Sequence, residues 1–198
     1  MHTPHASVKV SARLSRAAHL LFALCVCLAL AAPAAAQKRE HLTPEEIELV
    51  RDNQELDART KVFITAAERR LLAVTNPAES AKNAPKEKEK WGEVQGTRTQ
   101  LFYDISKILD EAVVNVDDVA EHNPESPLLR KSLFMLAEAT ARMLPALSKL
   151  REAAGSEAEA DQLERALETA REITDAAKEK GVTAEDLKTK AKAAKKND

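Results

Sequence analysis

The two cysteines of the chain, Cys25 and Cys27, are the first residues whose types and spacing could do chemistry. A C-x-C pair can hold a metal ion, form a redox pair or accept a lipid. Here the pair lies in an apolar run that follows a basic segment and precedes three small alanines. That order is typical of a secretory signal peptide with an A-x-A cleavage site. We therefore expect residues 1–36 to be removed between Ala36 and Gln37, together with both cysteines.

Two other interpretations of this segment are an uncleaved anchor helix and a lipid attachment site. The apolar span approaches the roughly 20 residues that an anchor helix needs to cross a bilayer, but Pro33 and the alanines favour cleavage. Lipid attachment requires a small residue before the modified cysteine, and Leu24 and Val26 stand there instead. We expect an exported protein, periplasmic or extracellular, with an N-terminal membrane anchor as the alternative.

The sequence from Gln37 onward offers little for catalysis. It keeps two histidines, His41 and His122, and neither has the glutamate three residues earlier that a di-iron bundle uses. It has no H-E-x-x-H zinc motif, no C-x-x-C-H haem motif and no glycine-rich phosphate loop. We therefore expect a protein that is not an enzyme and that carries no cofactor.

One acidic cluster allows a metal hypothesis. Asp117, Asp118, Glu121 and His122 share a helix face at spacings of three and four, where they could gather a divalent cation. Such groups are more often solvated helix surface, and we favour that interpretation. A metal- or small-ligand-binding bundle remains an alternative.

Charge is distributed unevenly along the chain. After removal of residues 1–36, 27 basic residues face 32 acidic ones, a formal charge of −5. From Lys178 onward seven lysines face four acids, whereas the part before it carries 20 bases against 28 acids. An acidic body argues against nucleic acid as a partner. The lysine-rich tail, 182–198, can attract anionic lipid only weakly because it lacks a strong apolar face.

Local signals predict four long helices. Thr43, Pro44 and Glu46 form a capping box that opens the first helix, which we expect to continue to Asn76. Residues 76–85 are then a linker.

The later helices follow the same signals. The second helix is expected from Pro85 to Asn123, and the third from Ser126 to Gly155, kinked or shortened by Pro145. The fourth opens with a second capping box at Ser156 and Glu159 and ends at Gly181.

Apolar residues recur every three to four positions along these segments, which indicates amphipathic helices packed side by side. The fold class is therefore all-α: an elongated antiparallel four-helix bundle with coiled-coil-like packing over residues 37–181. A short basic C-terminal helix or tail, 182–198, follows it.

Polar residues interrupt the apolar stripe of the first helix. Asn53 and Thr60 occupy stripe positions, and Asp57 lies beside them. Buried polar side chains at such positions can fix register or partner choice, or they can sit at the wet edge of a narrow stripe. Trp91, the only tryptophan, either closes one end of the core or is an exposed recognition anchor. These four residues are our candidate partner contacts.

The opening Leu42-Thr43-Pro44-Glu45-Glu46 resembles the L-T-x-x-Q starts of the small periplasmic chaperones of the Spy and CpxP type, with Glu46 in place of the glutamine. The resemblance covers these five residues and implies a cradle-shaped dimer with a basic concave surface, which the acidic body does not indicate. Our leading hypothesis is a non-enzymatic envelope protein that acts by protein binding or scaffolding, with an unknown protein partner or by self-association. A periplasmic chaperone or stress protein is the alternative.

Overall fold

The computed structural model describes residues 39–182, so the predicted signal peptide and most of the basic tail lie outside the described residues. The chain divides into two units, 1–39 and 40–198, and every element below belongs to the second. The described part is helical throughout, with six α-helices and no strand, which confirms the all-α class. Their order is α2 (Pro44–Asp52), α3 (Leu56–Thr75), α4 (Pro77–Trp91), α5 (Arg98–His122), α6 (Pro127–Lys149) and α7 (Glu157–Glu179), with a short 3₁₀ turn η1 (Arg151–Ala153) before α7.

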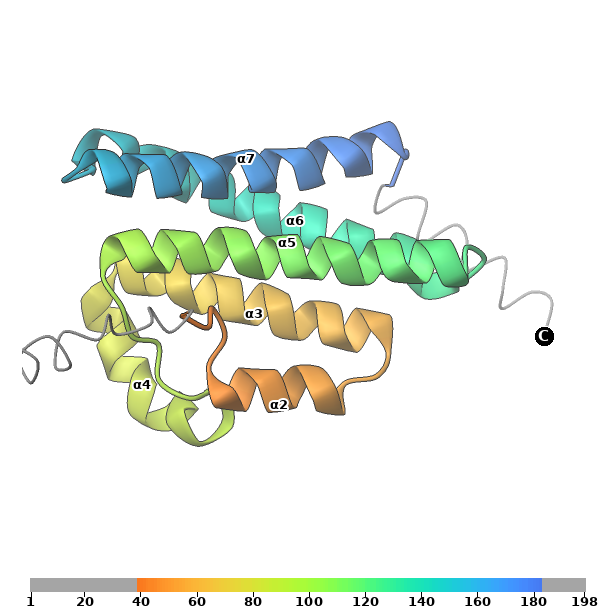
Figure 1. The fold of residues 1–198 in the computed structure, drawn as a ribbon, viewed down its shortest axis with the longest axis horizontal. Coiled ribbons are helices and arrows are strands. Elements are labelled where there is room, and N and C mark those ends of the chain that lie inside the picture. Colours follow the sequence, from red (N-terminus) through yellow and green to blue (C-terminus); the bar gives the residue numbers. More distant parts are fainter. Residues whose placement is uncertain (1–38, 183–198) are drawn as a thin grey trace, which may run out of the picture. The chain divides into compact units, whose positions relative to one another are not determined.

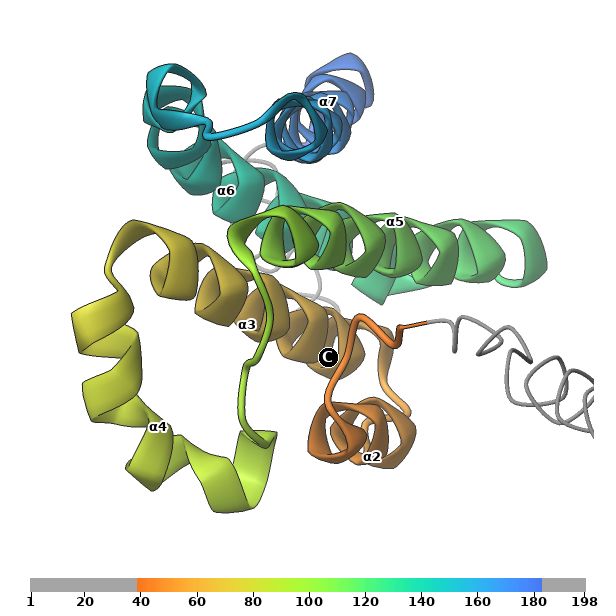
Figure 2. The same ribbon diagram turned by 60° about the vertical axis from the view of Figure 1, so that its left-hand side comes forward.

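The four longest helices surround the core. α3 packs against α5 and α6, and α7 packs against the same two helices, so α3 and α7 lie across the core from each other. The chain runs in one direction in α5 and α7 and in the opposite direction in α3 and α6 (Figure 1). The shorter α2 and α4 pack against α3 and against each other, on the side away from α7 (Figure 2).

The predicted first helix is two helices. Its capping box is present, since Thr43 Oγ1 accepts from the Glu46 amide at 3.1 Å and Glu46 Oε2 accepts from the Thr43 amide at 2.9 Å. The helix stops at Asn53, whose amide and Nδ2 both donate to the Leu49 carbonyl, at 3.2 and 2.7 Å. The chain turns there and α3 begins at Leu56.

The predicted linker 76–85 is wrong, because those residues begin α4. Asn76 ends α3 and also caps α4, with Oδ1 accepting from the Glu79 amide at 3.2 Å, and Pro77 occupies the first helical turn. Pro85 lies inside α4 instead of opening a new helix. The second predicted helix therefore begins later, at Arg98, where Thr97 and Gln100 form a capping box.

The later boundaries agree better with the sequence. α6 begins after Ser126 and continues through Pro145 to Lys149, and Ser156 caps α7 by accepting from the Glu159 amide at 3.2 Å. The second half of that predicted capping box does not form. The Glu159 carboxylate accepts from Arg98 Nε at 2.8 Å instead and ties α7 to the start of α5.

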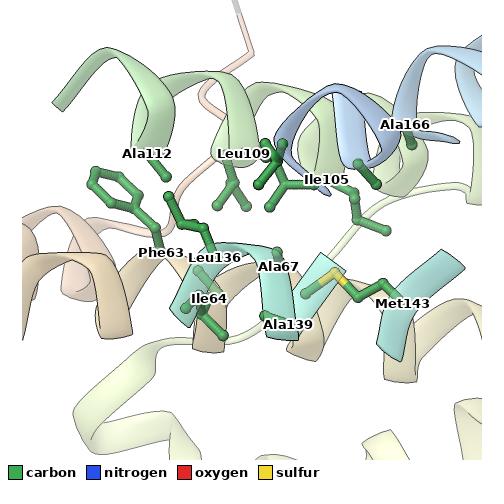
Figure 3. Close-up of a cluster of buried hydrophobic side chains, with 14 of the residues drawn as sticks. Phe63, Ile64, Ala67, Ile105, Leu109, Ala112, Leu136, Ala139, Met143 and Ala166 are labelled. Atoms are coloured by element: carbon green, nitrogen blue, oxygen red, sulfur yellow. The ribbon is translucent and has the colours of Figure 1, made fainter. Parts of the chain in front are cut away.

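The core is built from the predicted apolar stripes of α5 and α7 and from parts of those of α3 and α6. Figure 3 shows side chains from these four helices meeting in its centre, among them Phe63, Leu109, Leu136 and Ala166, all fully buried. Alanines and single leucines or isoleucines at successive turns allow the backbones to approach closely. This close packing is looser toward one end of α7, where the site described next lies.

Candidate functional site

A groove opens between the second half of α5, the first half of α6 and the second half of α7. Its volume is about 1440 Å³, and its lining runs from Asp110 to Ala120 on α5, from Pro124 to Leu136 at the start of α6, and from Thr169 to Val182 on and after α7. The helix segments that line it lie toward the right-hand ends of α5, α6 and α7 in Figure 1. It is several times larger than a second groove, of about 260 Å³, beside α3 and α4.

Large aliphatic side chains from all three helices form the floor of this groove: Val113, Val114, Val116, Leu129, Leu133, Leu136, Ile173 and Val182. They are the outer ends of the same stripes that make the core. Leu136 is fully buried, whereas Leu133 and Leu129, about one and two turns earlier, are only partly covered. Val114 is 63% exposed, the only large hydrophobic residue of the described chain in that state. The apolar surface of α6 thus continues beyond the helices that cover it.

Charged residues surround the floor, and most of the basic ones are already engaged. Arg130 Nη2 donates to the Gly181 carbonyl at 2.9 Å, and Lys131 Nζ pairs with Asp57 at 2.5 Å. Asp110 is held by Lys107 at 3.0 Å.

Three acidic residues of the rim are not engaged in this way. Asp117, Glu125 and Glu172 form no side-chain hydrogen bond or ion pair with any residue between 39 and 182, and all three are exposed. Lys180 is the one basic residue of the rim that is likewise unpaired within that range. The unengaged part of the rim is therefore mainly acidic.

The three candidate contacts on the first predicted helix are used within the chain. Asn53 ends α2, and Thr60, which is 1% exposed, donates its hydroxyl to the Leu56 carbonyl at 2.7 Å. Asp57 joins α3 to α6, and the hydrogen bond from Lys131 lowers the pKa of its carboxyl below the ordinary value. Their polarity is thus explained by bonds within the chain, and a role in partner contact stays a prediction.

Trp91 ends α4 and is half-buried. It lies outside the core cluster, and its carbonyl accepts from Thr43 Oγ1 at 2.7 Å and from Arg69 Nη1 at 3.0 Å. The Arg69 guanidinium stands 5.9 Å from the centre of its ring, and the Lys90 ammonium 5.5 Å. Trp91 therefore joins α4 to α2 and α3, and neither end of the groove includes it.

A buried charge cluster holds this junction together, and the sequence analysis missed it. Glu46 is fully buried, and its Oε1 accepts from Arg69 Nη1 at 2.6 Å and from Arg70 Nη1 at 2.5 Å. Arg70 is 2% exposed and also donates to the His41 carbonyl at 2.8 Å. A signal was present, because Arg70 follows Ala66 and Ala67 at spacings of four and three and so occupies the buried stripe of α3.

The metal hypothesis gains no support from the described residues. His122 Nδ1 lies 3.3 Å from Asp118 Oδ1, both side chains are exposed, and His122 also contacts the Asp118 carbonyl at 2.8 Å. His41 instead pairs with Glu111 at 2.7 Å. No group of three or more metal-ligating side chains is gathered anywhere from residue 39 to residue 182. The predicted cleavage site at Ala36 and Gln37 lies outside this range.

Comparisons with protein-family models, with curated proteins and with solved structures found no match to this chain. Among the residues that the structure describes, no helix is both long and apolar enough to span a bilayer. The groove, its floor and its acidic rim therefore carry the functional argument.

Proposed function

We propose that this chain is a non-enzymatic, exported helical-bundle protein that acts by binding another protein in the α5–α6–α7 groove. On this proposal α3, α5, α6 and α7 are the bundle, and the protein works as a binding or scaffolding component of the cell envelope. The observation that carries the proposal is the apolar floor of the groove. Contiguous apolar surface with a polar rim marks an interaction site in soluble proteins.

The size of the groove favours a protein partner over a small ligand. Small-molecule sites commonly enclose about 300–1,000 Å³, and this groove is larger and open along one side. Val114, in the floor, is 63% exposed, so an incoming side chain could cover it. The acidic body also disfavours nucleic acid, whose phosphates would be repelled.

The test is capture from the envelope of the exporting cell with three forms of the full chain. These are the wild type, Val114→Gln in the groove, and Ala141→Gln as the matched control on an exposed position of α6 that does not line the groove. Fully burying a valine contributes about 1.5 kcal/mol. Because Val114 is 63% exposed before binding, its burial would contribute about 0.9 kcal/mol, and the groove variant should bind the recovered partner about fivefold more weakly.

The proposal requires that a partner be retained by wild type and by the control, and that the purified partner show the same loss with Val114→Gln. Equal binding by both variants would remove the groove from the proposal.

A periplasmic chaperone is the second candidate, because an open apolar groove can also hold unfolded segments. Suppression of the aggregation of an unfolding client separates the two functions. A scaffold should leave aggregation unchanged, whereas a chaperone should suppress it and lose this effect with Val114→Gln.

A further inference from the structure

We infer that the occupant of the groove is an amphipathic α-helix of another protein whose apolar face is flanked by lysine or arginine. This inference rests on the proposed function, because it names the class of partner for the same groove. Shape, backbone chemistry and charge each contribute to it.

The dimensions of the groove fit a short helix. Its α5 wall spans residues 110–120, which at 1.5 Å per residue is about 15 Å, and its α7 wall is slightly longer. A helix about 10 Å across and about 18 Å long has a volume of about 1,400 Å³, so a groove of about 1440 Å³ is large enough to hold one. About twelve residues, or three turns, would fill it.

The walls of the groove favour a helix over an extended segment. All three walls are helices, whose backbone groups are already paired along most of their length. An extended peptide would bury its own N–H and C=O groups there with few partners, which costs free energy. A helix satisfies those groups internally and presents one apolar face, which is the common helix-in-groove mode of recognition.

The charges on the rim of the groove indicate which residues should flank the apolar face of the partner helix. Asp117, Glu125 and Glu172 project from three different parts of the rim and are unpaired within the described residues, against Lys180 alone on the basic side. An acidic flank would meet like charge, and a basic flank would meet three carboxylates.

Residues 183–198 of the same chain are the competing occupant. They follow Val182, which lines the groove, and they contribute five lysines. They contain one large apolar residue, Leu187, whereas four large aliphatic side chains of the floor are at least partly exposed: Val113, Val114, Leu129 and Leu133. The lysines of the tail therefore complement the charge of the acidic rim, but the tail has too few apolar side chains to cover the floor. A partner helix with an apolar face and basic flanks would do both.

The test uses two synthetic 16-residue peptides, each held helical by a hydrocarbon staple. They share one leucine-rich face, and the flanks of that face are all lysine in one peptide and all glutamate in the other. Fluorescence anisotropy measures their affinity for the full chain. The matched variant replaces the three free acids by Asp117→Asn, Glu125→Gln and Glu172→Gln, and Val114→Gln reports whether binding occurs in the groove.

We expect the lysine peptide to bind wild type about tenfold more tightly than the glutamate peptide. The preference should fall below about threefold in the triple variant and in high salt, which screens exposed charges. Both peptides should lose affinity with Val114→Gln.

Other outcomes separate the inference from the proposed function. Equal binding of both peptides, still weakened by Val114→Gln, would overturn the basic flank and leave the groove as a binding site. Binding of the lysine peptide only after Leu187→Ser and replacement of the five tail lysines by glutamine would assign the groove to the tail. Binding of neither peptide to any form would overturn both proposals.

Discussion

Replacement of Glu46 by glutamine tests the buried charge cluster that joins α2 to α3. The substitution keeps the size of the side chain and removes its charge. In the native chain one carboxylate oxygen accepts from Arg69 and Arg70, and the other accepts from the Thr43 amide. All of these contacts lie where water has little access, since Glu46 is fully buried and the Arg70 side chain is 3% exposed.

The expected loss of stability follows from the partners that Arg69 and Arg70 keep in the Glu46→Gln variant. Arg69 keeps Glu87, at 2.9 Å. Arg70 keeps only the carbonyls of Ala66 and His41, so its charge stays buried without a counter-charge. Removing one partner of a buried pair costs about 3–5 kcal/mol. We expect about 3 kcal/mol, because the glutamine still offers one acceptor.

Urea unfolding followed by circular dichroism measures this loss, and the fluorescence of Trp91 reports the α2–α3–α4 junction separately. Glu48→Gln is the matched control on the same helix, because Glu48 pairs with Arg51 at the exposed surface and its loss should cost less than about 0.5 kcal/mol. Adding Arg70→Met to Glu46→Gln should recover part of the stability by removing the unpaired charge. A Glu46→Gln variant within about 1 kcal/mol of Glu48→Gln would refute the reasoning.

Three further predictions address a backbone position, a pH effect and processing. Gly92→Ala should destabilise by about 2–4 kcal/mol, since Gly92 has φ +67° and an added Cβ would lie 2.7 Å from Thr43 Oγ1 and 2.9 Å from Thr43 Cβ. Gly181→Ala, with φ +58° and open space, should cost about 1 kcal/mol in the same urea assay. Asp57→Asn should cost about 0.5–1 kcal/mol at pH 7. Because Lys131 lowers the folded-state pKa of Asp57, this difference is present above the unfolded pKa and should disappear as the pH falls from about 5 to about 2; a difference that persists at pH 2 contradicts the ion pair. Mass spectrometry of the exported protein should find Gln37 at its N-terminus, and a mature chain that still contains the two cysteines would disprove the predicted cleavage.

The sequence predicted the helices best where cap signals and apolar stripes agreed. α7 begins and ends within two residues of its prediction, because Ser156 and Gly181 mark its ends and its stripe is continuous between them. The start of α5 was missed although Thr97 and Gln100 carry the same capping-box signature as Thr43 and Glu46. The sequence analysis did not identify this cap, because the apolar spacing across Trp91 and Val94 suggested one continuous helix.

Proline was misread for a physical reason. Asn76-Pro77 ends α3 as predicted, but the same two residues are also a good helix start, since Asn76 caps and Pro77 suits the first turn. Pro85 was expected to open a helix, but it lies inside α4, where a proline leaves the carbonyl four residues earlier unpaired. That carbonyl belongs to Ala81, and α4 has no buried residue, so water can pair with it at little cost.

The groove could not be derived from the stripes alone, although they contain its residues. The stripe of α6 keeps the same spacing from Leu129 to Leu150 in the sequence, and nothing in that spacing says that Leu129 and Leu133 are only partly covered. How far these leucines are covered depends on the path of α7 relative to α5 and α6 near the C-terminal end of α7. The spacing of apolar residues within one helix does not determine that path. The α7 stripe supplies Ile173 and otherwise small residues at this end, so it cannot fill the space that the leucines of α6 require. An apolar helix from outside the described chain would fill this space and cover Leu129 and Leu133. The partly exposed floor of the groove is therefore the reason for proposing a helical partner.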